Sequence, residues 1–321
     1  MSSRFKAVSA LVAAMVLVGS SVAVGRSMTA AVPLYFASLA RFALASLVLV
    51  PLVVVLEGRF PRVSRRTLAA LFAQAVSGSF LFTACLLTGL TLTGAAQAGV
   101  VAAATPAMVA ILGRLLFRER LSRAALLAIA CTTAGLLVLG ARSGDGGGTS
   151  PLVGNLLVLC AVFFEAIFLL LRRTVREPLT PLAAAMWVSL LGFVLFLGPG
   201  TWQGAGLSLG QFSGRALGEM AYYGLGVTAA AYMLWFYGVV RVDAATAGVA
   251  TGVMPVAALV FAALWCGEVV GWRELAGCAG VLAGILCLAA QGAKKRRGSG
   301  MFPKPRRRNT QEPADLGGGG T

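Results

Sequence analysis

The chain has 321 residues, of which 58% are hydrophobic and only 12% are charged, and its formal net charge is +16. A soluble globular domain is about 25% charged, so this composition excludes a single soluble domain. The sequence contains no histidine, which excludes histidine-ligated metal sites and histidine proton relays.

The hydrophobic residues are gathered in ten runs, most of them near the roughly 20 residues that cross a bilayer as a helix. A lipid-facing segment must satisfy its own backbone hydrogen bonds, and a helix does so. The sequence therefore predicts an all-α membrane protein with ten transmembrane helices. In chain order these cover residues 11–24, 34–56, 68–87, 95–117, 124–140, 152–171, 179–197, 216–240, 244–265 and 275–291. Arg4 and Lys6 before the first run also fit a cleaved signal peptide, which would leave nine helices.

The basic residues are distributed unevenly between the loops. With both termini in the cytoplasm, 21 Lys and Arg residues fall in the inside segments and four fall outside, namely Arg26, Arg142, Arg215 and Arg273. Such a split follows the positive-inside rule. It predicts a multi-pass protein of the plasma (inner) membrane with both termini cytoplasmic. The basic charge is then explained by the lipid bilayer, and we expect no nucleic-acid partner.

Two stretches of small apolar residues are nearly the same. AAQAGVVAAATPA begins at Ala95, AATAGVATGVMPV begins at Ala244, and the two match at six of 13 positions. The same shift of 149 residues places Glu119 on Glu268. The chain is therefore predicted to be a tandem of two five-helix repeats. Because five is odd, the second repeat is inverted relative to the first, which is the architecture of many secondary transporters.

The predicted domain organisation follows from this repeat. Residues 1–141 form the first five-helix repeat and residues 152–292 the second, joined by a Gly-rich external connector at 142–151. Residues 293–321 are basic, rich in Pro and Gly and without apolar periodicity, and are expected to form a disordered cytoplasmic tail.

Corresponding segments of the two halves carry the same motif. ATPAMVAILGRLLFRERLS and VMPVAALVFAALWCGEVVGWREL each place a glutamate 13 residues after a proline. With the ten-helix inverted repeat, this motif resembles the EamA-domain permeases of the drug/metabolite transporter superfamily, over residues 5–292. The resemblance implies a permease, with export the expected direction, whose small-molecule substrate belongs to a range that includes amino acids, drugs and other metabolites. We expect a monomer or homodimer.

Charged residues inside predicted helices are candidate site residues, because burying a charge in hydrocarbon costs about 2.5–3.5 kcal/mol. Glu165 lies seven residues before Arg172. It is predicted to bind a substrate ammonium or to carry a proton; the alternative is a structural ion pair with Arg41. Arg41 is predicted to bind a substrate carboxylate. The family resemblance instead implies that Arg41 is structural and ties helices together.

Several uncharged residues are further candidates for substrate binding. Gln74 and Gln97 have side chains that can bind either a substrate or a neighbouring helix. Thr228, Tyr232 and Trp235 follow i, i+4, i+7 spacing, so they share one helix face.

Pro106 and Pro255 occupy equivalent positions in the two repeats. Each removes a helical hydrogen bond. They are predicted to be hinge residues; static kinks are the alternative.

Known catalytic signatures are absent. The sequence has no nucleophile elbow, Walker loop, zincin motif or dinucleotide fingerprint, and its six cysteines lack metal-ligand spacing. We expect no enzyme activity, no cofactor and no metal, so a gradient or facilitated diffusion must drive transport. The alternatives are a lipid or lipid-linked carrier flippase of the same architecture, and a non-transporting membrane enzyme or scaffold.

Overall fold

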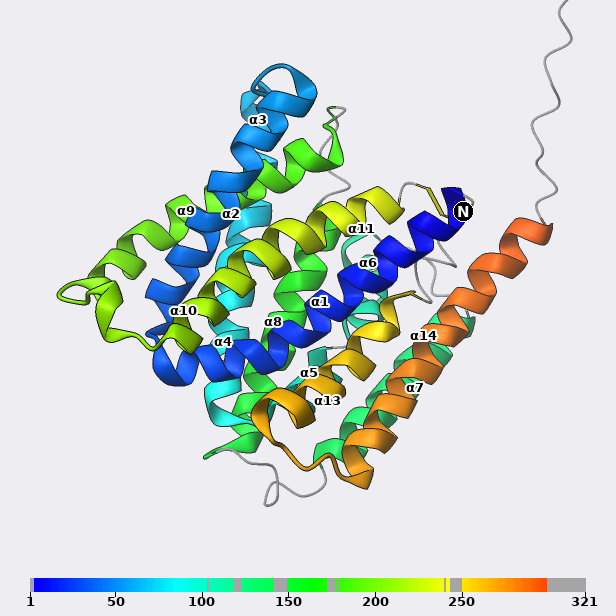
Figure 1. Cartoon of the computed structure of the whole chain (residues 1–321). Coiled ribbons are helices and arrows are strands. Elements are labelled where there is room, and N and C mark those ends of the chain that lie inside the picture. The colour runs from blue at the N-terminus through cyan, green and yellow to red at the C-terminus, as the bar shows by residue number, and fades with distance from the viewer. Residues whose placement is uncertain are drawn as a thin grey trace, which may run out of the picture.

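Every regular element in the described part of the chain is a helix (Figure 1). The computed structural model describes residues 3–102, 104–117, 123–140, 149–171, 177, 179–239, 241–242 and 250–298. The first half contains α1 (Ser3–Ala31), α2 (Leu34–Glu57), α3 (Arg65–Gln74), η1 (Ala75–Leu81), α4 (Phe82–Leu92), α5 (Ala95–Ala102), α6 (Thr105–Phe117) and α7 (Arg123–Gly140). The second half contains α8 (Pro151–Leu171), α9 (Pro181–Gly204), η3 (Leu209–Gln211), α10 (Gly214–Ala221), η4 (Tyr222–Ala230), α11 (Ala231–Val239), α13 (Val253–Cys266) and α14 (Trp272–Gly298).

Serine side chains cap the N-termini of two equivalent helices. The side chain of Ser64 accepts a hydrogen bond from the Thr67 N–H at the start of α3, and Ser213, 149 residues later, caps α10 in the same way. Each capped helix then passes into a π-helical segment, η1 in the first half and η4 in the second. These wide turns therefore recur at equivalent positions of the two halves.

Helices of each half pack against helices of the other half in equivalent pairs. α1 packs against α13, and α8 correspondingly packs against α5 and α6. α8 also packs against α4, while α1 packs against η4 and α11. Two pairs join equivalent helices, namely α2 with α9 and α7 with α14; the second pair runs side by side in Figure 1.

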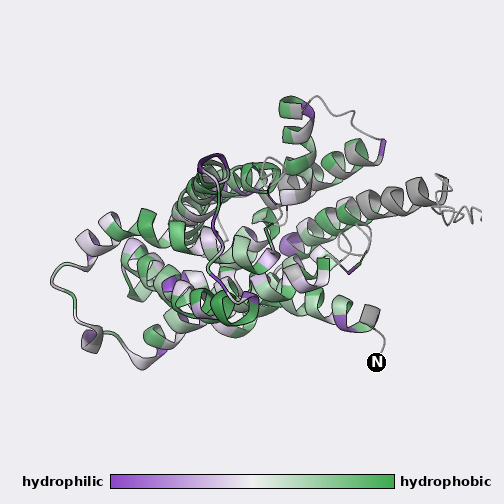
Figure 2. Cartoon of the chain, turned by 90° about the horizontal axis from the view of Figure 1, so that it is seen from above, coloured by the Kyte–Doolittle hydropathy of each residue, from purple (hydrophilic) through white to green (hydrophobic). Residues whose placement is uncertain are grey.

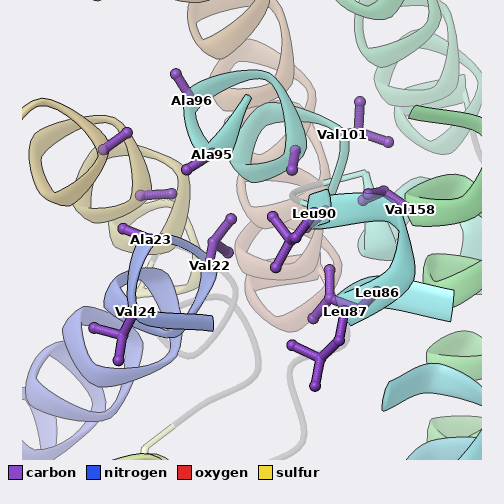
Figure 3. Close-up of a cluster of buried hydrophobic side chains, with 14 of the residues drawn as sticks. Val22, Ala23, Val24, Leu86, Leu87, Leu90, Ala95, Ala96, Val101 and Val158 are labelled. Carbon is purple, nitrogen blue, oxygen red and sulfur yellow. The ribbon is translucent and has the colours of Figure 1, made fainter. Parts of the chain in front are cut away.

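Small residues bring the helices close together. A Cβ atom added at Gly19 of α1 would lie 2.5 Å from the carbonyl oxygen of Met254, and Gly99 of α5 lies directly against Ala258 of α13. The main core, where α1, α4, α5 and α8 meet, includes the aliphatic side chains drawn in Figure 3, among them Val22, Leu90 and Val158. The close approach of α1 and α5 to α13 therefore depends on residues without bulky side chains, while larger aliphatic side chains fill the core beside it.

Large apolar side chains face outward on many helices. Val55, Leu264 and Val269 are 77%, 79% and 95% exposed, and hydrophobic residues cover most of the helices in Figure 2. Within the described part of the chain, five helices are long and apolar enough to cross a membrane, or six if the bent pair α5 and α6 counts as one span. The chain is thus an all-helical, multi-pass membrane protein. The structure does not confirm the number of ten spans, which stays a prediction.

Candidate functional site

Arg41 is the eighth of the 24 residues of α2 and is only 7% exposed. Its Nε donates a hydrogen bond of 2.6 Å to the hydroxyl of Thr228 in η4. The rings of Phe42 and Tyr223 each lie 4.7 Å from the guanidinium carbon. Gly224 permits this approach, because a Cβ there would lie 3.0 Å from the Arg41 carbonyl oxygen. The cation is therefore held by a hydroxyl and two aromatic faces rather than by a carboxylate.

The wide turn of η4 positions the Thr228 hydroxyl. That hydroxyl donates to the carbonyl of Tyr223, five residues earlier, at 3.0 Å, while it accepts from Arg41. Both of its hydrogen-bonding roles are thus occupied. Arg41 and Thr228 come from different halves of the chain, so this contact joins the two halves.

Glu165 lies on α8, next to the first residue of α6. Its Oε2 is 2.5 Å from the hydroxyl oxygen of Thr105. In the described part of the chain, neither Glu165 nor Arg41 forms an ion pair. The structural alternative considered from the sequence, a direct Arg41–Glu165 pair, is therefore not formed.

Tyr232 links these two charges. Its buried hydroxyl lies within electrostatic reach of both Arg41 and Glu165, and its ring packs in the cluster around Ala45 and Leu49. Trp235 joins a different cluster, with Leu11 and Ala250. The structure thus brings Arg41, Thr228, Tyr232 and Glu165 into one region, while Trp235 packs elsewhere.

The two glutamines hydrogen-bond to neighbouring helices. Gln74, 1% exposed, donates from Nε2 to the Phe168 carbonyl of α8 at 3.2 Å. Gln97 accepts at Oε1 from Thr93 at 3.1 Å and from Asn155 at 3.5 Å. These contacts support the helix-contact alternative for both residues.

The prolines lie in the first turns of helices. Pro106 is the second residue of α6 and Pro255 the third of α13, where a missing N–H is least costly. α5 and the rest of α6 are bent by 41° at the break that precedes Pro106. Residues 243–249, which precede α13, lie outside the described residues, as do Glu119 and the 293–321 tail beyond residue 298.

A family model described as the EamA-like transporter family matches residues 5–141 and 152–290. The chain belongs to the EamA-like transporter family. The resemblance stated from the sequence is thereby confirmed, and a transporter, not an enzyme, is the class to which the comparisons point.

Two curated relatives support this assignment of the EamA-like transporter. The "Uncharacterized transporter YetK" of Bacillus subtilis (strain 168) is 34% identical over 278 residues, covering 86% of this chain and 84% of its own length. An "Uncharacterized transporter" of Archaeoglobus fulgidus is 25% identical over 256 residues, covering 79% and 87%. A solved structure described as "Crystal structure of protein" aligns with a TM-score of 0.61 at 21% identity over 91% of this chain and 99% of its own, and shows the fold alone.

One carboxylate joins the halves of this EamA-like transporter at the start of α5. Glu268 forms an ion pair with Arg26 and accepts from the backbone N–H groups of Ala95 and Ala96 at 2.7 and 2.9 Å. It therefore caps a helix of the other half. In the same region Glu219, 3% exposed, accepts at Oε1 from Ser27, Arg215 and Trp265.

Contacts also join the halves where α2 ends and α9 begins. Thr180, which caps α9, donates to Glu57, and Trp187 donates from Nε1 to the Pro61 carbonyl at 3.2 Å. The hydrogen bond from Ser64 holds the pKa of Glu177, in the loop before α9, below its usual value. Both regions of contact therefore involve side chains from each repeat.

Sequence reasoning missed several residues of the site. Thr105 could have been noticed because it directly precedes a proline. Phe42 and Tyr223 had no signal of their own, since nothing in the sequence shows which aromatic residues surround a buried arginine.

We expect Glu268→Gln to lower the free energy of unfolding by about 1–3 kcal/mol, because it removes the ion pair between Glu268 and Arg26 and weakens the cap on α5. Arg26→Gln should cost less, since the carboxylate keeps both backbone N–H groups. Thermal unfolding of the purified protein in detergent measures both variants. The double variant should lose less than the sum of the two, whereas strictly additive losses would show that the pair is not coupled.

Proposed function

We propose that this EamA-like transporter exports small zwitterionic metabolites, with amino acids as the leading class, across the plasma membrane by alternating access. One observation carries the proposal: a buried arginine and a carboxylate, neither ion-paired with a described residue, both lie within electrostatic reach of the buried Tyr232. A cation and an anion close to one tyrosine match the carboxylate and ammonium of an amino acid.

The geometry at Arg41 supports the carboxylate half of this site. Nε is already used by Thr228, and the Nη atoms donate to no described residue. An arginine can bind a carboxylate through two parallel hydrogen bonds. A substrate carboxylate would therefore supply the negative charge that no described residue supplies there.

Glu165 supplies the opposite charge. Apart from Thr105, no described residue hydrogen-bonds to its carboxylate. It comes from α8 of the second half, whereas Arg41 comes from α2 of the first. A substrate bound to both would span the two halves, so relative movement of the halves would act directly on the binding site.

The exchange of packing partners supports an inverted repeat. The caps at Ser64 and Ser213, the segments η1 and η4, and the pairs α1–α13 and α8–α5/α6 occur in equivalent places. We assign residues 1–141 and 152–292 to the two repeats, and 142–151 and 293–321 to the connector and tail. Equivalent halves that exchange conformations can open one side as the other closes. The matched relatives are named transporters, which gives the lipid-flippase alternative no support.

The topology has its own test. We place both termini in the cytoplasm and the 142–151 connector outside, because the basic residues divide 21 to four. Single cysteines at Ser143 and Ser299, in a background without native cysteines, are labelled in intact cells with an impermeant maleimide. Only Ser143→Cys should react before permeabilisation. Equal reaction of both sites from outside would refute this orientation.

Transport itself is tested by uptake of a panel of radiolabelled amino acids into inside-out and right-side-out vesicles, with and without a proton gradient. We expect accumulation in inside-out vesicles. Arg41→Gln and Glu165→Gln should each reduce it about tenfold or more, because each leaves a substrate charge unpaired.

Arg114→Gln is the matched control for this experiment, since Arg114 is exposed near the end of α6. It should transport like the wild type. Wild-type rates in both Arg41→Gln and Glu165→Gln, or a folded protein that moves no amino acid in either orientation, would overturn the proposal.

A further inference from the structure

The break between α5 and α6 contains a carbonyl group without a helical donor. Pro106 has no N–H, so it cannot bond to the carbonyl of Ala102, four residues earlier. The hydroxyl of Thr105 takes the place of that donor, with its oxygen 2.9 Å from the Ala102 carbonyl oxygen. The same hydroxyl oxygen is 2.5 Å from Oε2 of Glu165.

A threonine hydroxyl has one proton, and this proton cannot serve both neighbours. An ionised carboxylate only accepts, so when Glu165 is charged the Thr105 proton goes to Glu165 and the Ala102 carbonyl loses its donor. A protonated carboxyl donates. When Glu165 is neutral it donates to Thr105, and Thr105 donates to Ala102. The two protonation states therefore differ in whether the carbonyl at the break is satisfied.

We propose that Thr105 transmits the protonation of Glu165 to the break between α5 and α6, and that Glu165 is the proton-binding site of the transporter. This inference rests on the proposed function, for which it names the coupling ion and the segment on which that ion acts. Below the pKa of Glu165, the hydrogen bonds from Glu165 to Thr105 and from Thr105 to the Ala102 carbonyl stabilise the break. Above that pKa, the carbonyl is released and α6 is freer to move relative to α5.

Among the described groups around Glu165, no other carboxylic acid could control this change of hydrogen-bond partners. The helices packed against α8 are α3, η1, α4, α5 and α6, and none of them contains another Asp or Glu. Arg65 and Arg66 on α3 and Arg114 on α6 are exposed, and Cys85 on α4 faces Cys160. Among the described residues, Tyr232 on α11 is a further titratable group within electrostatic reach.

Hydrogen exchange of the full-length protein in lipid nanodiscs tests the inference. Exchange of a peptide covering residues 102–108 is measured across a pH series by mass spectrometry and corrected for the intrinsic effect of pH. In the wild type, corrected exchange should rise about fivefold as Glu165 ionises, the factor expected when one hydrogen bond of about 1 kcal/mol is lost.

Matched variants separate the relay from general loosening. Thr105→Ser keeps the hydroxyl and should keep the pH response. Thr105→Val keeps the shape and should exchange fast at every pH. Glu165→Gln carries no charge and offers Thr105 an amide N–H donor at every pH, so this variant should exchange slowly at every pH. Peptides from α2 and α9 serve as the control for folding and should be unchanged throughout.

A pH response retained in Thr105→Val, or no response in the wild type, would overturn the inference. This readout does not depend on transport. A vesicle screen that finds no substrate would contradict the proposed function, but it would not change the conclusion drawn from hydrogen exchange. If hydrogen exchange of residues 102–108 did not depend on pH although transport was active, only the role of Thr105 would be contradicted.

Discussion

The backbone of a membrane protein has no water in the bilayer core with which to form hydrogen bonds, and the rest of this structure depends on that constraint. Uninterrupted helices satisfy it by themselves. Where α5 begins and where it breaks, side chains supply the missing partners: Glu268 accepts from the first N–H groups of α5, and Thr105 reaches the carbonyl that Pro106 leaves open. Both carboxylates near these points, Glu268 and Glu165, come from the second half of the chain. The integrity of α5 and α6 in the first half is thus controlled by the second.

The first of the two small-residue stretches lies at a close contact between the halves. Gly99, within the first stretch, lies directly against Ala258, just after the second. α5 and α13 can approach closely because both lack bulky side chains at their contact, and van der Waals contact between small residues is a main source of helix association in lipid. Gly99 in the first stretch therefore packs against α13 just beyond the second stretch, at the interface between the halves.

Much of this organisation could be predicted from the sequence, because hydrophobic runs, prolines and the shift of 149 residues are local or periodic signals. The depth of Arg41 and Glu165 in their helices was also readable. Contacts between helices were not. The i, i+4, i+7 pattern assigned Thr228, Tyr232 and Trp235 to one face, yet η4 widens the turn at Thr228 and Trp235 packs in another cluster. Nothing local indicated that Gln74 would donate to a backbone carbonyl of α8. Hydropathy also does not determine how many spans the helices make, since several of them are short or broken.

The central claim is that Arg41 and Glu165 form two ends of one zwitterion site, and a binding cycle with modified ligands tests it most directly. Affinity of the purified protein for a transported amino acid is compared with that for its N-acetyl derivative and its methyl ester. The account predicts that acetylation, which removes the ammonium charge, weakens binding to the wild type about tenfold or more but hardly affects binding to Glu165→Gln. Esterification, which removes the carboxylate charge, should likewise weaken binding to the wild type but hardly affect binding to Arg41→Gln. Equal penalties for each modification in the wild type and in both variants would contradict the claim.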